Sequence, residues 1–277
     1  MQNIVTYAVA GIMVFLGNKI GGSLGNAALG TVAGSIIAIL FLIFRIRAEL
    51  FMAFGSKTLK SGDIKKAFKY YDKAVNTKSL RLDYMIYYAY IALRYGQTEK
   101  CHELLDKIEG LKLTPALQAD FNTTKGLYLW KSGDTEGAAE FLKSAHESSP
   151  NSKTYGQLGF MLLELGKYDE AKKFNQEAYD YNPDDPSIAD NMAMCYYYFG
   201  ENDKAIEIYK SIMSKGTKMP VIYYNYALCL EKAGKFDEAI DQLDSALQYK
   251  FSYLAAVSKE QVQSKFDELV QRKQQNI

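Results

Sequence analysis

Hydrophobic residues are distributed along the chain in two different patterns. Residues 1–17 and 27–44 form two nearly continuous apolar runs, whereas the rest of the chain places apolar residues at the spacing of an amphipathic helix. The run 27–44 holds 18 uncharged residues, enough for a helix to span a bilayer, and the first run is slightly shorter. Glycine and polar residues between the runs, from Gly17 to Asn26, are typical of a turn. The pattern therefore predicts a transmembrane helical hairpin, with residues 1–46 as a membrane anchor.

The remaining chain repeats a pattern of small residues around glycines. Six glycines follow one another at spacings between 33 and 37 residues: Gly62, Gly96, Gly133, Gly166, Gly200 and Gly234. A Gly or Ala stands seven residues before each of them, and an Ala or Cys stands five residues after. Small side chains at these two positions allow consecutive helices to cross closely. The spacing therefore predicts six helix-turn-helix units, at residues 48–81, 82–115, 119–151, 152–185, 186–219 and 220–253.

A last amphipathic segment follows the sixth unit. Ser258, with Gln261 three residues later, matches the capping box that begins a helix. The apolar residues that follow fall on one helical face: Val262, Phe266, Leu269 and Val270. Residues 254–277 are therefore predicted to form a capping helix and tail that cover the open end of the array.

The fourth unit carries the fullest set of recurrent residues: Leu158, Gly159, Gly166, Tyr168, Ala171, Ala178 and Pro183. These residues resemble the tetratricopeptide repeat (TPR), which couples a Leu-Gly pair, a turn glycine, a packing alanine and a closing proline. The tryptophan that opens the family's repeat is replaced in every unit, and the closing proline remains only at Pro150 and Pro183. The resemblance covers residues 48–253. It implies an all-α, right-handed superhelical solenoid of about six units.

Basic residues are concentrated directly after the second apolar run. Residues 45–81 hold ten Lys or Arg and three Asp or Glu, whereas residues 82–277 have a net charge of −7. The basic residues closest to the run are Arg45, Arg47, Lys57, Lys60, Lys65 and Lys66. Because basic segments beside membrane spans stay on the cytoplasmic side, we expect a cell-membrane protein with two spans and cytoplasmic repeats. A cleaved signal peptide is the alternative, which the lack of a basic residue before the first run disfavours.

Small residues also recur every four positions within the predicted hairpin, at Gly17, Gly21 and Gly25 and at Gly30, Gly34 and Ala38. This spacing lets membrane helices approach closely. It favours closure of the hairpin on itself. The alternative is that several chains associate through these helix faces into a homo-oligomer.

No arrangement of residues in the sequence indicates catalysis or a bound cofactor. Phosphate-binding, nucleophile and zinc-protease motifs are absent, and His102 and His146 lie far apart. The three cysteines, Cys101, Cys195 and Cys229, form no CxxC pair, so we expect buried thiols and no metal site. The acidic balance beyond residue 81 disfavours nucleic acid as a partner. We therefore expect a protein that is not an enzyme and has no catalytic residues, cofactor or metal.

The resemblance implies a concave groove lined by the first helix of each unit. Residues expected on that face are apolar or aromatic: Ile86, Tyr90, Leu127, Trp130, Phe160, Met194, Tyr197, Tyr198, Tyr224 and Leu228. Such a surface suits a peptide or helix of a partner protein, and the alternative is that these residues are ordinary packing between helices. The sequence thus favours a membrane-anchored adaptor for protein–protein interaction. A self-assembling scaffold at the membrane is the second hypothesis, and an enzyme is the third.

Overall fold

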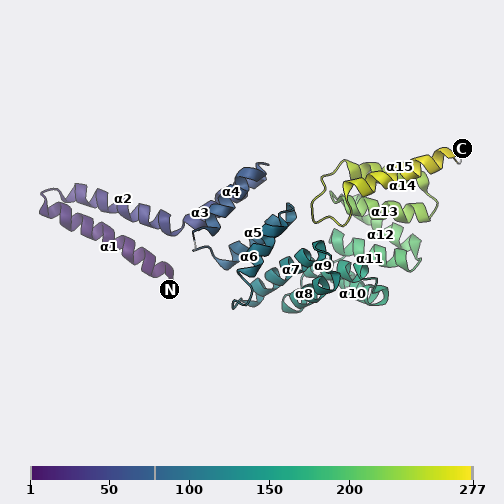
Figure 1. The fold of residues 1–277 in the computed structure, drawn as a ribbon, viewed down its shortest axis with the longest axis horizontal. Coiled ribbons are helices and arrows are strands. Elements are labelled where there is room, and N and C mark those ends of the chain that lie inside the picture. The colour runs from purple at the N-terminus through teal and green to yellow at the C-terminus, as the bar shows by residue number, and fades with distance from the viewer. Residues whose placement is uncertain (1, 78, 276–277) are drawn as a thin grey trace. The chain divides into compact units, whose positions relative to one another are not determined.

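The computed structural model describes residues 2–77 and 79–275, which form fifteen helices and no strand within those ranges (Figure 1). The all-α class expected from the sequence is thereby confirmed. The first residue of the expected anchor, the basic residue Lys78 and the last two residues of the expected tail lie outside the described residues. By their internal contacts, the residues fall into two units, Met1–Met85 and Ile86–Ile277.

The first unit begins with a hairpin of two long helices, α1 (Gln2–Ser23) and α2 (Ala27–Arg45). The expected end of the first helix near residue 17 is wrong, because α1 continues to Ser23 and the turn is confined to residues 24–26. Asn26 begins α2 as its N-cap, with its side chain accepting a hydrogen bond from the Leu29 backbone at 3.0 Å.

The glycines that predicted a longer turn instead lie where the two helices touch. A Cβ on Gly21 would stand 2.6 Å from the Gly30 Cα, and a Cβ on Gly34 would stand 2.7 Å from the Met13 carbonyl oxygen. Neither distance accommodates a side chain, so glycine permits the close contact. Small residues therefore close the hairpin on itself, and the surface that suggested a homo-oligomer is covered within one chain.

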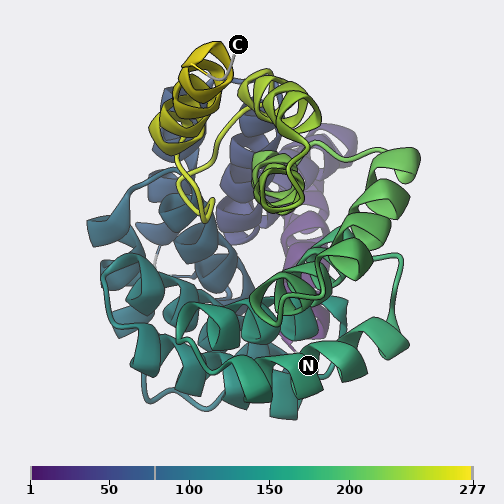
Figure 2. The same ribbon diagram turned by 90° about the vertical axis from the view of Figure 1, so that its right-hand side faces the viewer.

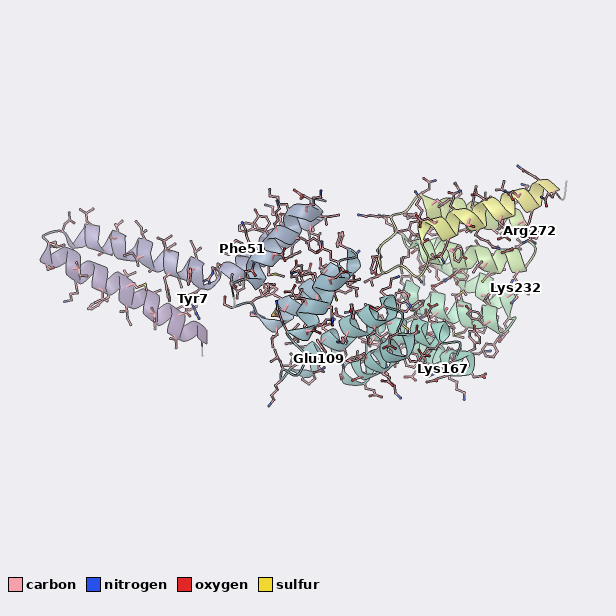
Figure 3. The ribbon with its side chains drawn as sticks, viewed as in Figure 1. Tyr7, Phe51, Glu109, Lys167, Lys232 and Arg272 are labelled. Atoms are coloured by element: carbon pink, nitrogen blue, oxygen red, sulfur yellow. The ribbon has the colours of Figure 1, made fainter. Side chains whose placement is uncertain are left out.

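The remaining hairpin surface is apolar and exposed. Tyr7 on α1 (67% exposed, Figure 3) and Leu40 on α2 (60%) are typical of it. By length and composition, two helical segments are able to cross a membrane: Val5–Ser23, with a mean hydropathy of 1.3, and Ala27–Arg45, with 2.5. The hairpin expected from the sequence is thus present as two apolar helices.

Twelve further helices form six consecutive helix-turn-helix pairs. The first helix and second helix of each pair are α3 (Arg47–Lys60) and α4 (Ile64–Val75), α5 (Leu82–Arg94) and α6 (Thr98–Asp106), α7 (Pro115–Lys131) and α8 (Thr135–Ser148), α9 (Ser152–Glu164) and α10 (Tyr168–Tyr181), α11 (Pro186–Tyr198) and α12 (Asn202–Lys215), and α13 (Pro220–Lys232) and α14 (Phe236–Leu247). Every predicted turn glycine has a positive φ, between 68° and 93°. Glycine adopts this conformation without steric cost, which explains its recurrence at the turn.

The two columns of small residues lie where the helices of a pair cross. Ala89 and Ala193, seven residues before a turn glycine, are fully buried, and so are Ala171 and Ala205, five residues after one. At Gly126 a Cβ would meet the Leu142 Cγ at 2.9 Å. The small residues thus allow the backbones to approach, as predicted.

The third pair departs from the regular spacing at its first helix. Helix α7 has 17 residues, whereas α9, α11 and α13 have 13 each, and it begins at Pro115 rather than at the expected residue 119. Thr114 caps it, and Pro115 occupies the first helical position that proline favours. Four extra residues add about one helical turn, so the helix keeps its packing face toward its neighbours despite the longer repeat.

Helix α15 (Lys259–Gln275) covers the last pair, as predicted. Its capping box forms, because Gln261 accepts from the Ser258 backbone at 2.7 Å and Ser258 accepts from the Gln261 backbone at 3.2 Å. Val262 and Leu269 are fully buried in the core around α13. Glu231 of α13 further ties the helix down through an ion pair with Lys265 at 2.8 Å.

Candidate partner-binding face

Four aromatic residues from the first helices of successive pairs pack on two neighbouring core clusters of the second unit. The Trp130 and Phe160 rings meet edge to face with centroids 5.1 Å apart, and both pack on the core cluster that contains Met194. Tyr197 packs on this cluster and also on the next one, where Tyr224 lies. These four half-buried residues, Trp130, Phe160, Tyr197 and Tyr224, are called the aromatic strip.

The other residues expected on this face are divided between the core and the surface. Ile86 is 3% exposed, and Leu127 and Met194 are each 8% exposed, so these three belong to the core beneath the face. Leu228 is half-buried. Tyr198 is 44% exposed and stacks on Tyr168 of α10, with centroids 4.3 Å apart, so it lies at the turn side of its helix.

Tyr90 lies outside the strip but close to another first helix. Lys153, near the start of α9, holds its ammonium 5.8 Å from the Tyr90 ring centroid. Lys153 also forms an ion pair with Asp120 of α7 at 3.5 Å. Tyr90 therefore contributes an aromatic group beside a basic and an acidic residue, in a polar part of the face.

Lysine side chains border the strip at two points. The Lys232 ammonium (labelled in Figure 3) lies 4.3 Å from the Tyr197 ring centroid and donates to the Tyr197 carbonyl at 3.0 Å. Burial raises the pKa of the Tyr197 and Tyr224 hydroxyls, so both remain protonated donors at neutral pH. The face thus offers aromatic surface together with hydrogen-bond donors.

The second lysine, Lys131, was missed by sequence reasoning. Its ammonium lies 4.4 Å from the Trp130 ring centroid. Burial lowers the pKa of Lys131, and the negative charge of Glu164 raises it. Burial also raises the pKa of Glu164, whereas a hydrogen bond with Trp130 and the positive charge of Lys131 lower it. Its place directly after the only tryptophan was the one signal in the sequence.

Asp190 on α11 is a second polar residue that the sequence did not single out. It is 8% exposed, accepts a hydrogen bond from the Tyr209 hydroxyl at 2.8 Å, and accepts another from the Asn225 amide at 3.1 Å. Burial raises the pKa of Asp190 to about 6, although the two hydrogen bonds act in the opposite direction and lower it. It stands ten residues before the turn glycine Gly200.

The basic residues that the sequence analysis expects beside the membrane belong to the first unit. Arg45, Lys57, Lys60, Lys65 and Lys66 are exposed. Arg47 is half-buried, with its guanidinium 3.7 Å from the Phe44 ring centroid.

The cysteines give no sign of chemistry in the part of the chain that the structure describes. All three are buried, and burial raises the pKa of Cys101 and Cys229 to about 12 and that of Cys195 to about 11. Thiols with such values stay protonated and unreactive at neutral pH. No group of three or more His, Cys, Asp or Glu residues suited to a metal occurs among the described residues.

Comparisons with family models and with known proteins identify the same family. A family model described as tetratricopeptide repeat matches residues 77–249. A TPR repeat-containing protein of Methanocaldococcus jannaschii is 29% identical over 159 residues, which cover 57% of this chain and 27% of that protein. An Hsp70-Hsp90 organizing protein of Arabidopsis thaliana is 25% identical over 218 residues, covering 74% and 37% respectively. The chain therefore spans less than half the length of these relatives.

Among solved structures, a tetratricopeptide repeat protein from Parabacteroides merdae superposes with a TM-score of 0.65. The superposition covers 93% of this chain and 97% of that one, at 13% sequence identity. At this identity, the likeness shows the shared fold and nothing about the partner.

Proposed function

Because the chain belongs to the tetratricopeptide repeat family, whose members mediate protein–protein interaction, we propose that it is a membrane-anchored adaptor. In this proposal the aromatic strip binds a peptide or helix of a partner protein, and the hairpin holds the repeats at the cytoplasmic side of the cell membrane. The partner is a protein, with neither nucleic acid nor a cofactor involved.

The aromatic strip is the observation that supports the binding role. Its residues come from four consecutive first helices, α7, α9, α11 and α13, and each of them is half-buried. Large aromatic side chains that a partner can desolvate supply most of the energy at protein interfaces. Lys131 and Lys232 at its edges add cations that favour aromatic or acidic groups in a partner.

The hairpin supports the membrane role. Most of its exposed side chains are apolar on both helices, and ten basic residues stand at its end and in the segment that follows it, residues 45–81. Protease added from outside intact cells should leave the repeats undigested, and carbonate or high salt should not release the protein. Digestion from outside would contradict the orientation, and release by carbonate would contradict insertion.

The binding role is tested by comparing stability with partner capture. Trp130→Ala and Tyr197→Ala each shorten a residue of the strip, whereas Tyr181→Ala removes a 55% exposed tyrosine from the second helix α10 as a control. We expect each strip variant to lose about 30-fold in capture of a specific protein, equivalent to about 2 kcal/mol, with little change in melting temperature. The Tyr181→Ala control should capture the same protein normally.

The opposite result identifies packing residues. If melting falls sharply while capture per folded molecule is unchanged, Trp130 and Tyr197 stabilise the core and do not contact a partner. The strip would then not be the binding surface.

A further inference from the structure

The loop between α14 and α15 contacts a part of the second unit that lies far from it in the sequence. Its ends are held in the core around α13, where Tyr249 stacks on Tyr223 with centroids 5.3 Å apart and Val257 is 5% exposed. The middle of the loop leaves this core, so that Tyr253 is 40% exposed. Residues 250–258 are called the strap.

The strap reaches back to the first two helical pairs of the second unit. The Tyr253 ring centroid lies 5.2 Å from the Lys131 ammonium, which also donates a hydrogen bond to the Ala255 carbonyl at 3.3 Å. Tyr253 also lies against the turn before α6, where a Cβ on Gly96 would be 3.4 Å from the Tyr253 Cδ2. Figures 1 and 2 show the loop extending from α14 and α15 toward α5 and α6.

Lys131 has one aromatic neighbour from its own helix and receives a second from the strap. The Trp130 ring centroid lies 4.4 Å from the Lys131 ammonium, and this ring meets Phe160 edge to face. A partly buried ammonium is stabilised by ring faces and by carbonyl oxygens, and Tyr253 and Ala255 supply one of each. Any peptide with an aromatic side chain and, two residues later, an accessible carbonyl offers Lys131 the same groups.

The tip of the strap is held less firmly than its ends. Tyr253 is exposed and Ala255 is half-buried, whereas Val257 is buried among residues of α13, α14 and α15. Segments with few buried apolar contacts open at lower free-energy cost than the core. The tip is therefore able to leave Lys131 while the last helical pair and α15 stay folded.

We propose that the strap is an intramolecular competitor for the partner. The site at Trp130 and Lys131 recognises a partner peptide with an aromatic side chain followed two residues later by a free main-chain carbonyl, and Tyr253 and Ala255 occupy the site until that peptide displaces them. This inference rests on the proposed function and states where on the strip, and by which chemistry, the partner is recognised. Because the strap is attached to the chain, its high effective concentration sets the affinity that the partner must exceed.

The only tryptophan among the 277 residues lies at this site, so its emission reports on the site directly. The probe is a synthetic peptide with the sequence of residues 250–258, titrated into the full chain in detergent micelles. We expect a weak response from the wild type, where the strap competes, and a dissociation constant at least roughly tenfold lower for Tyr253→Ala. Tyr253→Phe keeps the ring and should behave as the wild type.

Two further reagents test the recognition chemistry. A peptide with Ala in place of both of its aromatic residues, Phe251 and Tyr253, should not bind the Tyr253→Ala chain. Adding Lys131→Met, which keeps most of the aliphatic stem and removes the ammonium, should abolish the response. The strap proposal is overturned if Tyr253→Ala does not respond up to about 1 mM peptide, if the wild type responds equally, or if the response survives Lys131→Met.

Failure of the adaptor function gives a different outcome. In cells, Tyr253→Ala should capture more partner than the wild type. If both capture the same amount, the strap does not compete and the adaptor function stands. If neither captures a partner, the adaptor function fails, while the peptide titration still decides whether the strap occupies a recognition site.

Discussion

The buried carboxyl group of Asp190 should make the stability of the second unit depend on pH. Asp190 is 8% exposed and accepts hydrogen bonds from Tyr209 and Asn225. Burial raises its pKa to about 6 in the folded chain. In an unfolded chain an Asp titrates near about 3.9.

Between these two values the unfolded chain has released a proton that the folded chain still holds. The stability that this group contributes is therefore fully present below about pH 3.9 and is lost as the pH rises through about 6. A difference of about two pKa units corresponds to roughly 3 kcal/mol. Asp190→Asn removes the titration, and its amide oxygen can still accept the hydrogen bond from Tyr209.

The assay is urea unfolding of the full chain in micelles, followed by circular dichroism at about pH 4 and about pH 7. Relative to the wild type, Asp190→Asn should gain roughly 2 kcal/mol in unfolding free energy between the two conditions, because part of the full difference is already lost at about pH 4. Asp184→Asn makes the same charge change at a side chain that is 78% exposed. Relative to the wild type, its unfolding free energy should change little between the two pH values. A difference between wild type and Asp190→Asn that stays constant with pH would refute the reasoning.

Two further predictions concern the packing within a repeat and the attachment of α15. Gly159→Ala should destabilise the chain by about 1 to 3 kcal/mol, because its Cβ would stand 2.9 Å from the Asn175 Cγ, whereas Gly156→Ala, with its closest neighbour at 3.4 Å, should be tolerated. Equal melting temperatures for the two variants would contradict this account. Glu231→Gln should weaken the attachment of α15 by about 1 kcal/mol, because Lys265 loses its ionic partner on α13. Hydrogen exchange should then be faster in α15, and unchanged protection there would count against the ion pair.

The repeat array was predictable because its constraints are local and recur. Each turn requires a glycine with positive φ, and each helix crossing requires small residues at fixed distances from that glycine, so six copies of one pattern define the helical pairs. The end of α1 was not predictable from the same rule. Glycines such as Gly17 and Gly21 weaken a helix in isolation, but here they allow α2 to approach.

The candidate site was predictable only in outline. The first helices and their aromatic residues followed from the repeat pattern, but whether a residue such as Met194 lies in the core depends on how neighbouring pairs pack. The contact between Lys131 and the strap joins residues 124 positions apart, and no local pattern encodes such a separation. Asp190 is typical of a solvated residue in a helix, and only the packing of α11 and α13 reveals its burial.

The central claim, that the aromatic strip binds a protein partner at the membrane, is tested most directly by photo-crosslinking in living cells. A photoreactive phenylalanine replaces Tyr224 in the strip, or Tyr181 on the second helix α10 as the control, in the full-length chain. Both replacements exchange one aromatic side chain for another, so the fold should be preserved in each. The account predicts one recurrent protein adduct from position 224 and none of that protein from position 181. Equal crosslinking from both positions, or adducts from position 181 alone, would contradict it.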